Sequence, residues 1–291
     1  MLTRELIAKV RKLEIKTRKI VEDIAGGAYH SMFKGRGIEF SEVRAYSVED
    51  DVRDIDWNVT ARMGAPYIKK YVEERELTVI LAVDLSGSVE FGSTGTSKRD
   101  KMAEVAALLA FSAIRNHDKV GLLLFTDKDE LYLPQKSGRF HVLRVIRELV
   151  GSEVSGKGTN LPYALEFLSR SLKKRSVVFL LSDFVDGGDW EKPLKLLARR
   201  HDVAAFRVLD PMEISMPQSP VIQLADSETG KTFLYGSGRN IYQEVQEALR
   251  KDAEDHLRKS GVDMVDIPTE KDVVPPLIRF FKSRRLQSRR A

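Results

Sequence analysis

Residues 78–88 read TVILAVDLSGS, and this stretch decides the fold class. Residues 79–83 are all apolar, which is typical of a strand that is buried on both faces of a parallel sheet. The chain then changes at once to a polar turn that carries Asp84, Ser86 and Ser88. The stretch therefore predicts a central strand with oxygen-bearing side chains at its carboxyl end.

Strand and helix patterns alternate through the residues that follow this strand. Such alternation indicates a mainly parallel sheet joined by right-handed crossovers. We therefore predict an α/β fold built on a doubly wound, mainly parallel, six-stranded sheet. Beyond the first strand, the expected strands are 120–125, 130–133, 176–181, 203–209 and 262–267, and the expected helices are 97–116, 139–150, 161–173, 190–200, 240–260 and 273–282.

The sequence pattern also divides the chain into parts. Residues 2–24 carry apolar side chains mostly three or four positions apart, which predicts an amphipathic helix. Residues 35–76 contain short alternating segments that are typical of a small β-rich module. The predicted organisation is an N-terminal helix and β-rich module over residues 1–76, a main domain over 77–282 with a hairpin insertion at 211–239, and a basic tail over 283–291.

The composition is that of an ordinary globular protein, with 42% hydrophobic and 31% charged residues. No cysteine is present, which excludes disulfides, zinc-thiolate sites and thiol nucleophiles. Of the 48 basic residues, five lie in residues 282–291, which contain no acid, and the remaining 43 match the 43 acidic residues in number. We expect this tail to be solvated and frayed, and we disfavour nucleic acid as a partner.

The sequence contains no run that approaches the roughly 18 consecutive apolar residues of a membrane span. The first residues alternate charged and apolar side chains, unlike a signal peptide. The expected location is therefore the cytoplasm, with no membrane span.

Five oxygen-bearing side chains are expected near the carboxyl ends of the strands, where ligands bind to doubly wound sheets. Mg²⁺ prefers oxygen ligands in near-octahedral geometry. Two carboxylates and three neutral hydroxyls would leave such an ion short of anionic ligands, so we expect it to accept an external carboxylate. The candidate ligands are Asp84, Ser86, Ser88, Thr159 and Asp183.

In their order and on their expected elements, these five residues resemble the metal-ion-dependent adhesion site (MIDAS) of von Willebrand factor type A (vWA) domains. The resemblance implies direct ligation by the three hydroxyls, and aspartates that act directly or through water. It implies Mg²⁺ as the cofactor, with Mn²⁺ or Ca²⁺ as alternatives, and a vWA or Rossmann-like fold. The structural alternative is that Asp84 and Asp183 only cap helices while the hydroxyls satisfy turn backbones.

A second resemblance covers essentially the whole chain. It concerns the family called domain of unknown function 58, in its short class without membrane helices. Members are typically paired with MoxR-type AAA+ ATPases in a chaperone-like or maturation role, so the resemblance implies such a partner. The segments that carry it are residues 35–40, 43–46, 50–57, 60–62, 182–184, 201–203 and 226–230.

A dense mixed-charge segment surrounds the tryptophan of the β-rich module. We expect mainly an ion-pair network that fastens this module to the metal-site face, which would serve geometry more than stability. A partner-binding surface is the alternative. Its residues would be Arg44, Asp50, Asp51, Arg53, Asp56, Trp57 and Arg62.

These observations predict a non-enzymatic, metal-dependent protein-binding adaptor. Its partner would be a MoxR-type AAA+ ATPase or a client protein, bound through an acidic side chain at the metal. The five histidines are scattered, and the serines of the candidate site have no base partner that the sequence reveals. Two alternatives stay open: a Mg²⁺-dependent phosphoesterase or nuclease that uses Asp84, and a scaffold with a vestigial metal site.

Overall fold

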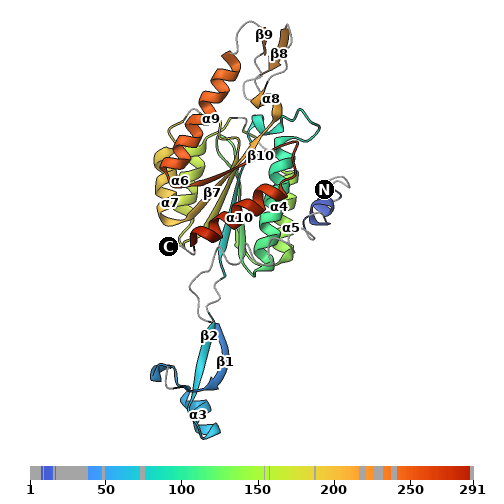
Figure 1. Cartoon of the computed structure of the whole chain (residues 1–291). Coiled ribbons are helices and arrows are strands. Elements are labelled where there is room, and N and C mark those ends of the chain that lie inside the picture. The colour runs from blue at the N-terminus through green and yellow to red at the C-terminus, as the bar shows by residue number, and fades with distance from the viewer. Residues whose placement is uncertain are drawn as a thin grey trace. The chain divides into compact units, whose positions relative to one another are not determined.

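The computed structural model divides the chain into two compact units (Figure 1). The larger contains Met1–Met32 and Thr78–Ala291, and the smaller is Phe33–Leu77. The structure describes residues 8, 10–15, 17, 39–47, 50–72, 76–153, 155–156, 158–186, 188–215, 221–225, 232–236 and 241–288. None of the helices in these ranges is both long enough and apolar enough to cross a lipid bilayer.

The larger unit is built on one six-stranded sheet with the order β10-β7-β6-β3-β4-β5. Only β5 is antiparallel to its neighbour, so the predicted α/β fold with a doubly wound, mainly parallel sheet is confirmed. The strands are β3 (Thr78–Asp84), β4 (Lys119–Phe125), β5 (Asp129–Lys136), β6 (Val177–Ser182), β7 (Asp202–Leu209) and β10 (Asp263–Pro268).

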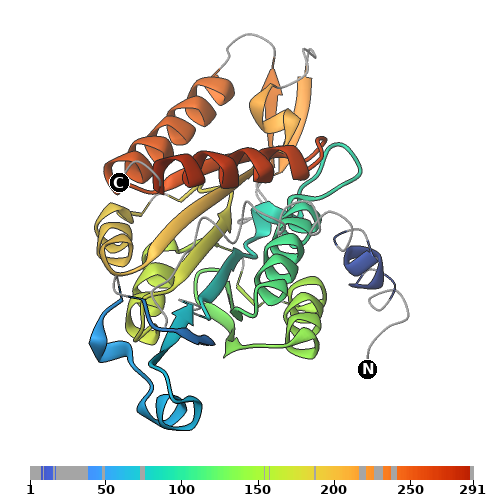
Figure 2. The ribbon, with the colours of Figure 1, turned by 60° about the horizontal axis from the view of Figure 1, so that its bottom comes forward.

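Helices cover both faces of this sheet (Figures 1 and 2). Ile80 and Ala82 of β3 pack into a core with residues of the helices on one face. The aromatic ring of Phe206 on β7 contacts Phe280 across the other face, at 5.3 Å between centroids. The first face carries α6 (Leu161–Ser171), α7 (Glu191–Arg200) and α9 (Ile241–Lys259), and the second carries α4 (Lys98–Arg115), α5 (Arg139–Gly151) and α10 (Val274–Ser288).

The winding of the sheet reverses at β3. From β3 the chain builds β4 and β5 on one side, and it then returns to form β6, β7 and β10 on the other side. The loops after β3 and β6 therefore leave the sheet next to each other at its carboxyl edge. This is the place where open α/β sheets bind ligands.

Between β7 and α9 lie a short helix and a hairpin. Helix α8 (Pro211–Ile214) begins directly after the sheet, with Asp210 as its N-cap. Strands β8 (Val221–Ala225) and β9 (Thr232–Gly236) pair antiparallel. The residues between these two strands lie outside the described part of the chain.

The smaller unit contains the antiparallel strands β1 (Glu39–Ala45) and β2 (Tyr67–Val72), with the 3-10 helix η1 (Val52–Asp54) and α3 (Trp57–Met63) between them. These strands fall where the alternating segments of the sequence predicted them.

The seven predicted partner-binding residues all lie in this smaller unit. Arg44 and Asp50 form an ion pair at 2.5 Å. The Asp51 carboxylate, however, accepts a hydrogen bond from the backbone N–H of Arg53, and that of Asp56 accepts from two N–H groups at the start of α3. Asp51 and Asp56 thus cap helices, and the ion-pair network expected to fasten this module to the metal-site face stays a prediction. The side chains of Arg53, Trp57 and Arg62 are exposed.

The C-terminal residues continue α10 as far as Ser288. Arg284 is nearly buried, and its guanidinium forms ion pairs with Asp202 at 2.7 Å and with Asp263 at 2.5 Å. The same guanidinium lies 5.0 Å from the centre of the Phe280 ring. The expectation of a frayed tail beyond residue 282 is therefore wrong for Arg284, whose charge is matched by the ends of β7 and β10.

We predict that Arg284→Ala lowers the free energy of unfolding by about 1–2 kcal/mol, because two carboxylates lose a charged hydrogen-bond donor. Lys282→Ala, two residues away and exposed, is the matched control and should change it by less than about 0.5 kcal/mol. Urea unfolding measured by circular dichroism decides the point. Equal effects of the two substitutions would contradict the packed position of Arg284.

Candidate metal site

The candidate site begins where two neighbouring parallel strands end. Asp84 is the last residue of β3, and Ser182 is the last residue of β6. Because Val83 pairs with Leu181 in the ladder, the polar residues that follow emerge side by side. Asp84, Ser182 and Asp183 are all buried, so their oxygens need partners within the protein.

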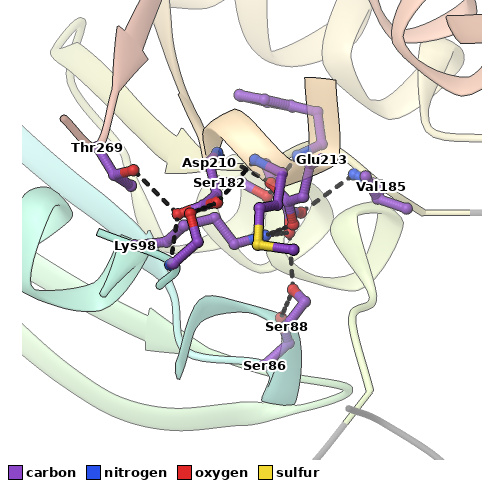
Figure 3. A network of polar contacts seen from close by, with 12 residues as sticks. Ser86, Ser88, Lys98, Ser182, Val185, Asp210, Glu213 and Thr269 are labelled. Atoms are coloured by element: carbon purple, nitrogen blue, oxygen red, sulfur yellow. Dashed lines mark hydrogen bonds and ion pairs between the residues drawn. The ribbon is translucent and has the colours of Figure 1, made fainter. Parts of the chain in front are cut away.

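The turn after β3 brings alternate side chains together. Oδ1 of Asp84 accepts the backbone N–H of Ser86 at 2.9 Å, a bond within the turn and not a cap of the following helix, whose N-cap residue is Ser86. The 3-10 helix η2 (Gly87–Glu90) begins directly afterwards. The hydroxyl oxygens of Ser86 and Ser88 then lie 3.1 Å apart (Figure 3). The two-residue spacing of Ser86 and Ser88 therefore places both hydroxyls in one cluster.

Hydrogen bonds also join the two strand ends. The Ser88 hydroxyl donates to Oδ2 of Asp183 at 2.7 Å, and the Ser182 hydroxyl donates to Oδ2 of Asp84 at 2.7 Å. Asp84 thus does more than stabilise its own turn, because it also accepts a hydrogen bond from Ser182 at the end of the neighbouring strand. The structure brings together four of the predicted ligands, and it adds Ser182, which the sequence analysis did not select.

The backbone after Asp183 is strained. Phe184 has a φ of 58°, in the left-handed region that non-glycine residues rarely adopt. Its N–H donates to the Ser182 hydroxyl at 2.9 Å, and its ring packs 6.0 Å from that of Trp190. Residues held in such regions persist only when their surroundings enforce them, and they often occur at functional sites.

Thr159, the fifth predicted ligand, lies on the loop before α6. Glu130 accepts the backbone N–H of Gly156 at 2.7 Å and the hydroxyl of Thr126 at 2.8 Å. On the other side of Thr159, the N–H of Asn160 donates to the Thr126 carbonyl at 3.1 Å. The loop is therefore anchored on one side of Thr159 to Glu130 of β5 and on the other side to Thr126 at the end of β4.

Lys98, at the start of α4, is the main residue that the sequence analysis missed. Its side chain is fully buried, and its ammonium lies 2.7 Å from Oδ2 of Asp183 and 2.5 Å from Oε1 of Glu213 (Figure 3). Local sequence offers no signal for this position, because a lysine in the first turn of a helix normally faces solvent.

A second cluster continues from Glu213 across the carboxyl edge of the sheet. Its Oε2 accepts the N–H of Asp210 at 3.1 Å. The Asp210 carboxylate accepts the N–H of Ser93 at 2.9 Å and the hydroxyl of Thr269 at 3.0 Å. Asp210 therefore ties the loops before α4 and after β10 to the start of α8.

The pKa values reflect burial and the neighbouring charges. Burial, and then the charge of Asp183, raise the pKa of Asp84 to about 7. Burial also acts to raise the pKa of Asp183, but the charge and hydrogen bond of Lys98 outweigh it and hold that pKa below its usual value. Asp183 thus stays ionised beside Lys98, whereas no basic residue in the described part of the chain forms an ion pair with Asp84.

The donor set fits a divalent cation. Asp84, Asp183, Glu213 and Lys98 together carry three negative charges and one positive charge when ionised, so the cluster has a net charge of −2. A divalent ion would balance this charge, and the serine hydroxyls provide further oxygen ligands. In the part of the chain that the structure describes, no group of three or more carboxylate or histidine side chains could hold a metal. Any ion here would therefore depend on Ser86 and Ser88.

Comparison with known proteins shows which family the chain belongs to. Residues 42–256 match the family described as "Protein of unknown function DUF58". The chain belongs to the DUF58 family. One relative, Uncharacterized protein Rv1480 of Mycobacterium tuberculosis, is 30% identical over 287 residues, which cover 97% of this chain and 90% of the relative. Another relative, Uncharacterized protein MAV169 of Mycobacterium avium, is 31% identical over 159 residues. The match covers 53% of this chain and 94% of that relative.

Among solved structures, this DUF58 chain is similar to the conserved hypothetical protein BatB from Bacteroides thetaiotaomicron. The TM-score is 0.50 at 17% identity, and the match covers 72% of this chain and 99% of BatB. At this identity the likeness concerns the fold alone.

We predict that Asp84→Asn stabilises the metal-free DUF58 protein at pH 8 by about 1–3 kcal/mol. A carboxyl whose folded-state pKa is raised stabilises the fold below its unfolded pKa near 4, and this contribution is lost as pH rises through about 7. The asparagine variant should therefore show a flatter decline in stability between pH 5 and pH 8, measured by urea unfolding in EDTA.

The matched control is Asp189→Asn, an exposed aspartate in the loop after β6. It should follow the pH dependence of the wild type. If Asp84→Asn also follows the wild type, Asp84 does not carry the uncompensated charge of the site.

Proposed function

We propose that this DUF58 protein is a non-enzymatic adaptor that binds a partner protein through a divalent cation, Mg²⁺ in the first instance. The observation that carries the proposal is the buried cluster at the ends of β3 and β6, where two carboxylates and two serine hydroxyls meet. Together with Lys98 and Glu213, this cluster has a net charge of −2 when all its groups are ionised. Asp84, Ser86 and Ser88 would hold the ion, with Thr159 and Asp183 completing the set directly or through water. The proposed ligand set is the one implied by the resemblance to the MIDAS of vWA domains.

A bound ion supplies a positive centre that can accept an oxygen ligand from outside. The chain's own residues limit the negative charge offered to it, because Asp183 is already shared with Ser88 and Lys98. The remaining attraction is for an anionic oxygen, and an aspartate or glutamate of a partner protein provides one. Ser182 and the N–H of Ser86 hold the Asp84 carboxylate in place for this role.

The finer proposal is that the partner is a MoxR-type AAA+ ATPase or one of its client proteins, and that the adaptor acts in the cytoplasm in chaperone-like assembly or maturation. Membership of the DUF58 family supports this partner, since the family resemblance implies pairing with such ATPases. The smaller unit, with Trp57 and Arg62 exposed, offers a second contact surface for it.

We predict that calorimetry of chelator-stripped protein shows one site for Mg²⁺ or Mn²⁺, and that Asp84→Ala abolishes the binding while the circular dichroism spectrum is retained. Asp189→Ala, which removes an exposed carboxylate from the loop after β6, is the matched control and should bind as the wild type does.

The wild type, Asp84→Ala and Asp189→Ala also test whether a MoxR-type ATPase is the partner. A purified MoxR-type ATPase should be retained by wild type and Asp189→Ala in Mg²⁺, and lost in EDTA or with Asp84→Ala. Metal-dependent hydrolysis of phosphoesters or nucleic acid that disappears in Asp84→Ala would contradict the adaptor and indicate an enzyme.

A further inference from the structure

The side chain of Lys98 is an unusual neighbour for a cation site. It has no exposed surface, although it begins a helix whose first turn usually faces water. Fully buried lysines occur almost only where the ammonium is paired. Here two carboxylates from separate loops, Asp183 after β6 and Glu213 on α8, both contact it.

The two carboxylates are not equivalent. Asp183 is buried and also accepts the Ser88 hydroxyl, so it belongs to the candidate metal cluster. Glu213 is partly exposed and is held in the capping box of α8 by the N–H of Asp210. Lys98 therefore divides one positive charge between the metal cluster and a carboxylate beside it.

We propose that Lys98 sets the charge of the metal site, and hence its cation affinity, and that Glu213 reduces this effect because it shares the ammonium of Lys98. This inference rests on the proposed function. The ammonium offsets one negative charge of Asp183 and so weakens the hold on a divalent ion. An ion held with less negative charge retains more attraction for an external carboxylate. Lys98 is thus a positioning and tuning residue that keeps the site open to an acidic partner.

The test uses a series of variants of the full-length protein that change the charge of the cluster one unit at a time. Lys98→Met changes the net charge of the cluster from −2 to −3, Glu213→Gln changes it to −1, and the double variant returns it to −2. Isothermal calorimetry with Mg²⁺ and with Mn²⁺ measures the affinity of each chelator-stripped protein. Lys101→Met is the matched control, because Lys101 is also buried in α4 but its partners are Glu104 and the carbonyl of Lys271, not Asp183 or Glu213.

Binding should be about tenfold or more tighter in Lys98→Met and about tenfold or more weaker in Glu213→Gln, since each changes one unit charge near the ion. The double variant and Lys101→Met should lie within about threefold of the wild type. If Lys98→Met fails to fold, Glu213→Gln and the double variant still decide. Glu213→Gln keeps the Lys98–Asp183 pair, and the double variant removes the charges of both Lys98 and Glu213.

Two outcomes overturn the inference, and they differ from each other. If the wild type binds metal but Glu213→Gln and every folded Lys98 variant bind with equal affinity, or in the reverse order, the tuning role of Lys98 is wrong while the metal site stands. If the wild type binds neither ion, the metal site itself is wrong, and the role of Lys98 falls with it.

Discussion

Two carboxylates, Asp84 and Asp183, are buried at the ends of adjacent strands, and the surrounding loops are arranged to compensate for them. A buried charge is costly unless it is paired and hydrogen-bonded. Asp183 meets this requirement with Lys98 and Ser88. Asp84 has a serine hydroxyl and a backbone N–H, but among the residues that the structure describes it has no cationic partner. This imbalance is the physical reason for assigning the site to a divalent ion.

The compensation extends across the whole carboxyl edge of the sheet. Lys98 connects Asp183 to Glu213. The backbone N–H of Asp210 bonds Glu213, and its carboxylate bonds the loops before α4 and after β10. Connected polar networks in a buried setting fix geometry, since every member needs its partners. The start of α8 is therefore held by the same charges that surround the candidate metal site.

The fold was predictable because its signals are local. An apolar strand such as residues 79–83 and the helices between strands are visible in short windows, and so is the spacing of Asp84, Ser86 and Ser88. Lys98 and Glu213 were not predictable, since they are 115 residues apart in sequence and meet only after the sheet has formed. Arg284 was missed for the same reason, because its partner Asp202 is 82 residues away. In the smaller unit Asp51 and Asp56 cap helices, a short-range role that the sequence analysis did not identify.

The central claim is that a divalent ion binds at the ends of β3 and β6, on Asp84 and the two serines. Anomalous diffraction from crystals soaked in Mn²⁺ tests it most directly, because the method locates the ion without assuming a ligand. The account predicts one strong peak within about 2.0–2.6 Å of a carboxylate oxygen of Asp84 and of the Ser86 and Ser88 hydroxyls. A map without a peak there, or with its strongest peak on other side chains, would contradict the account.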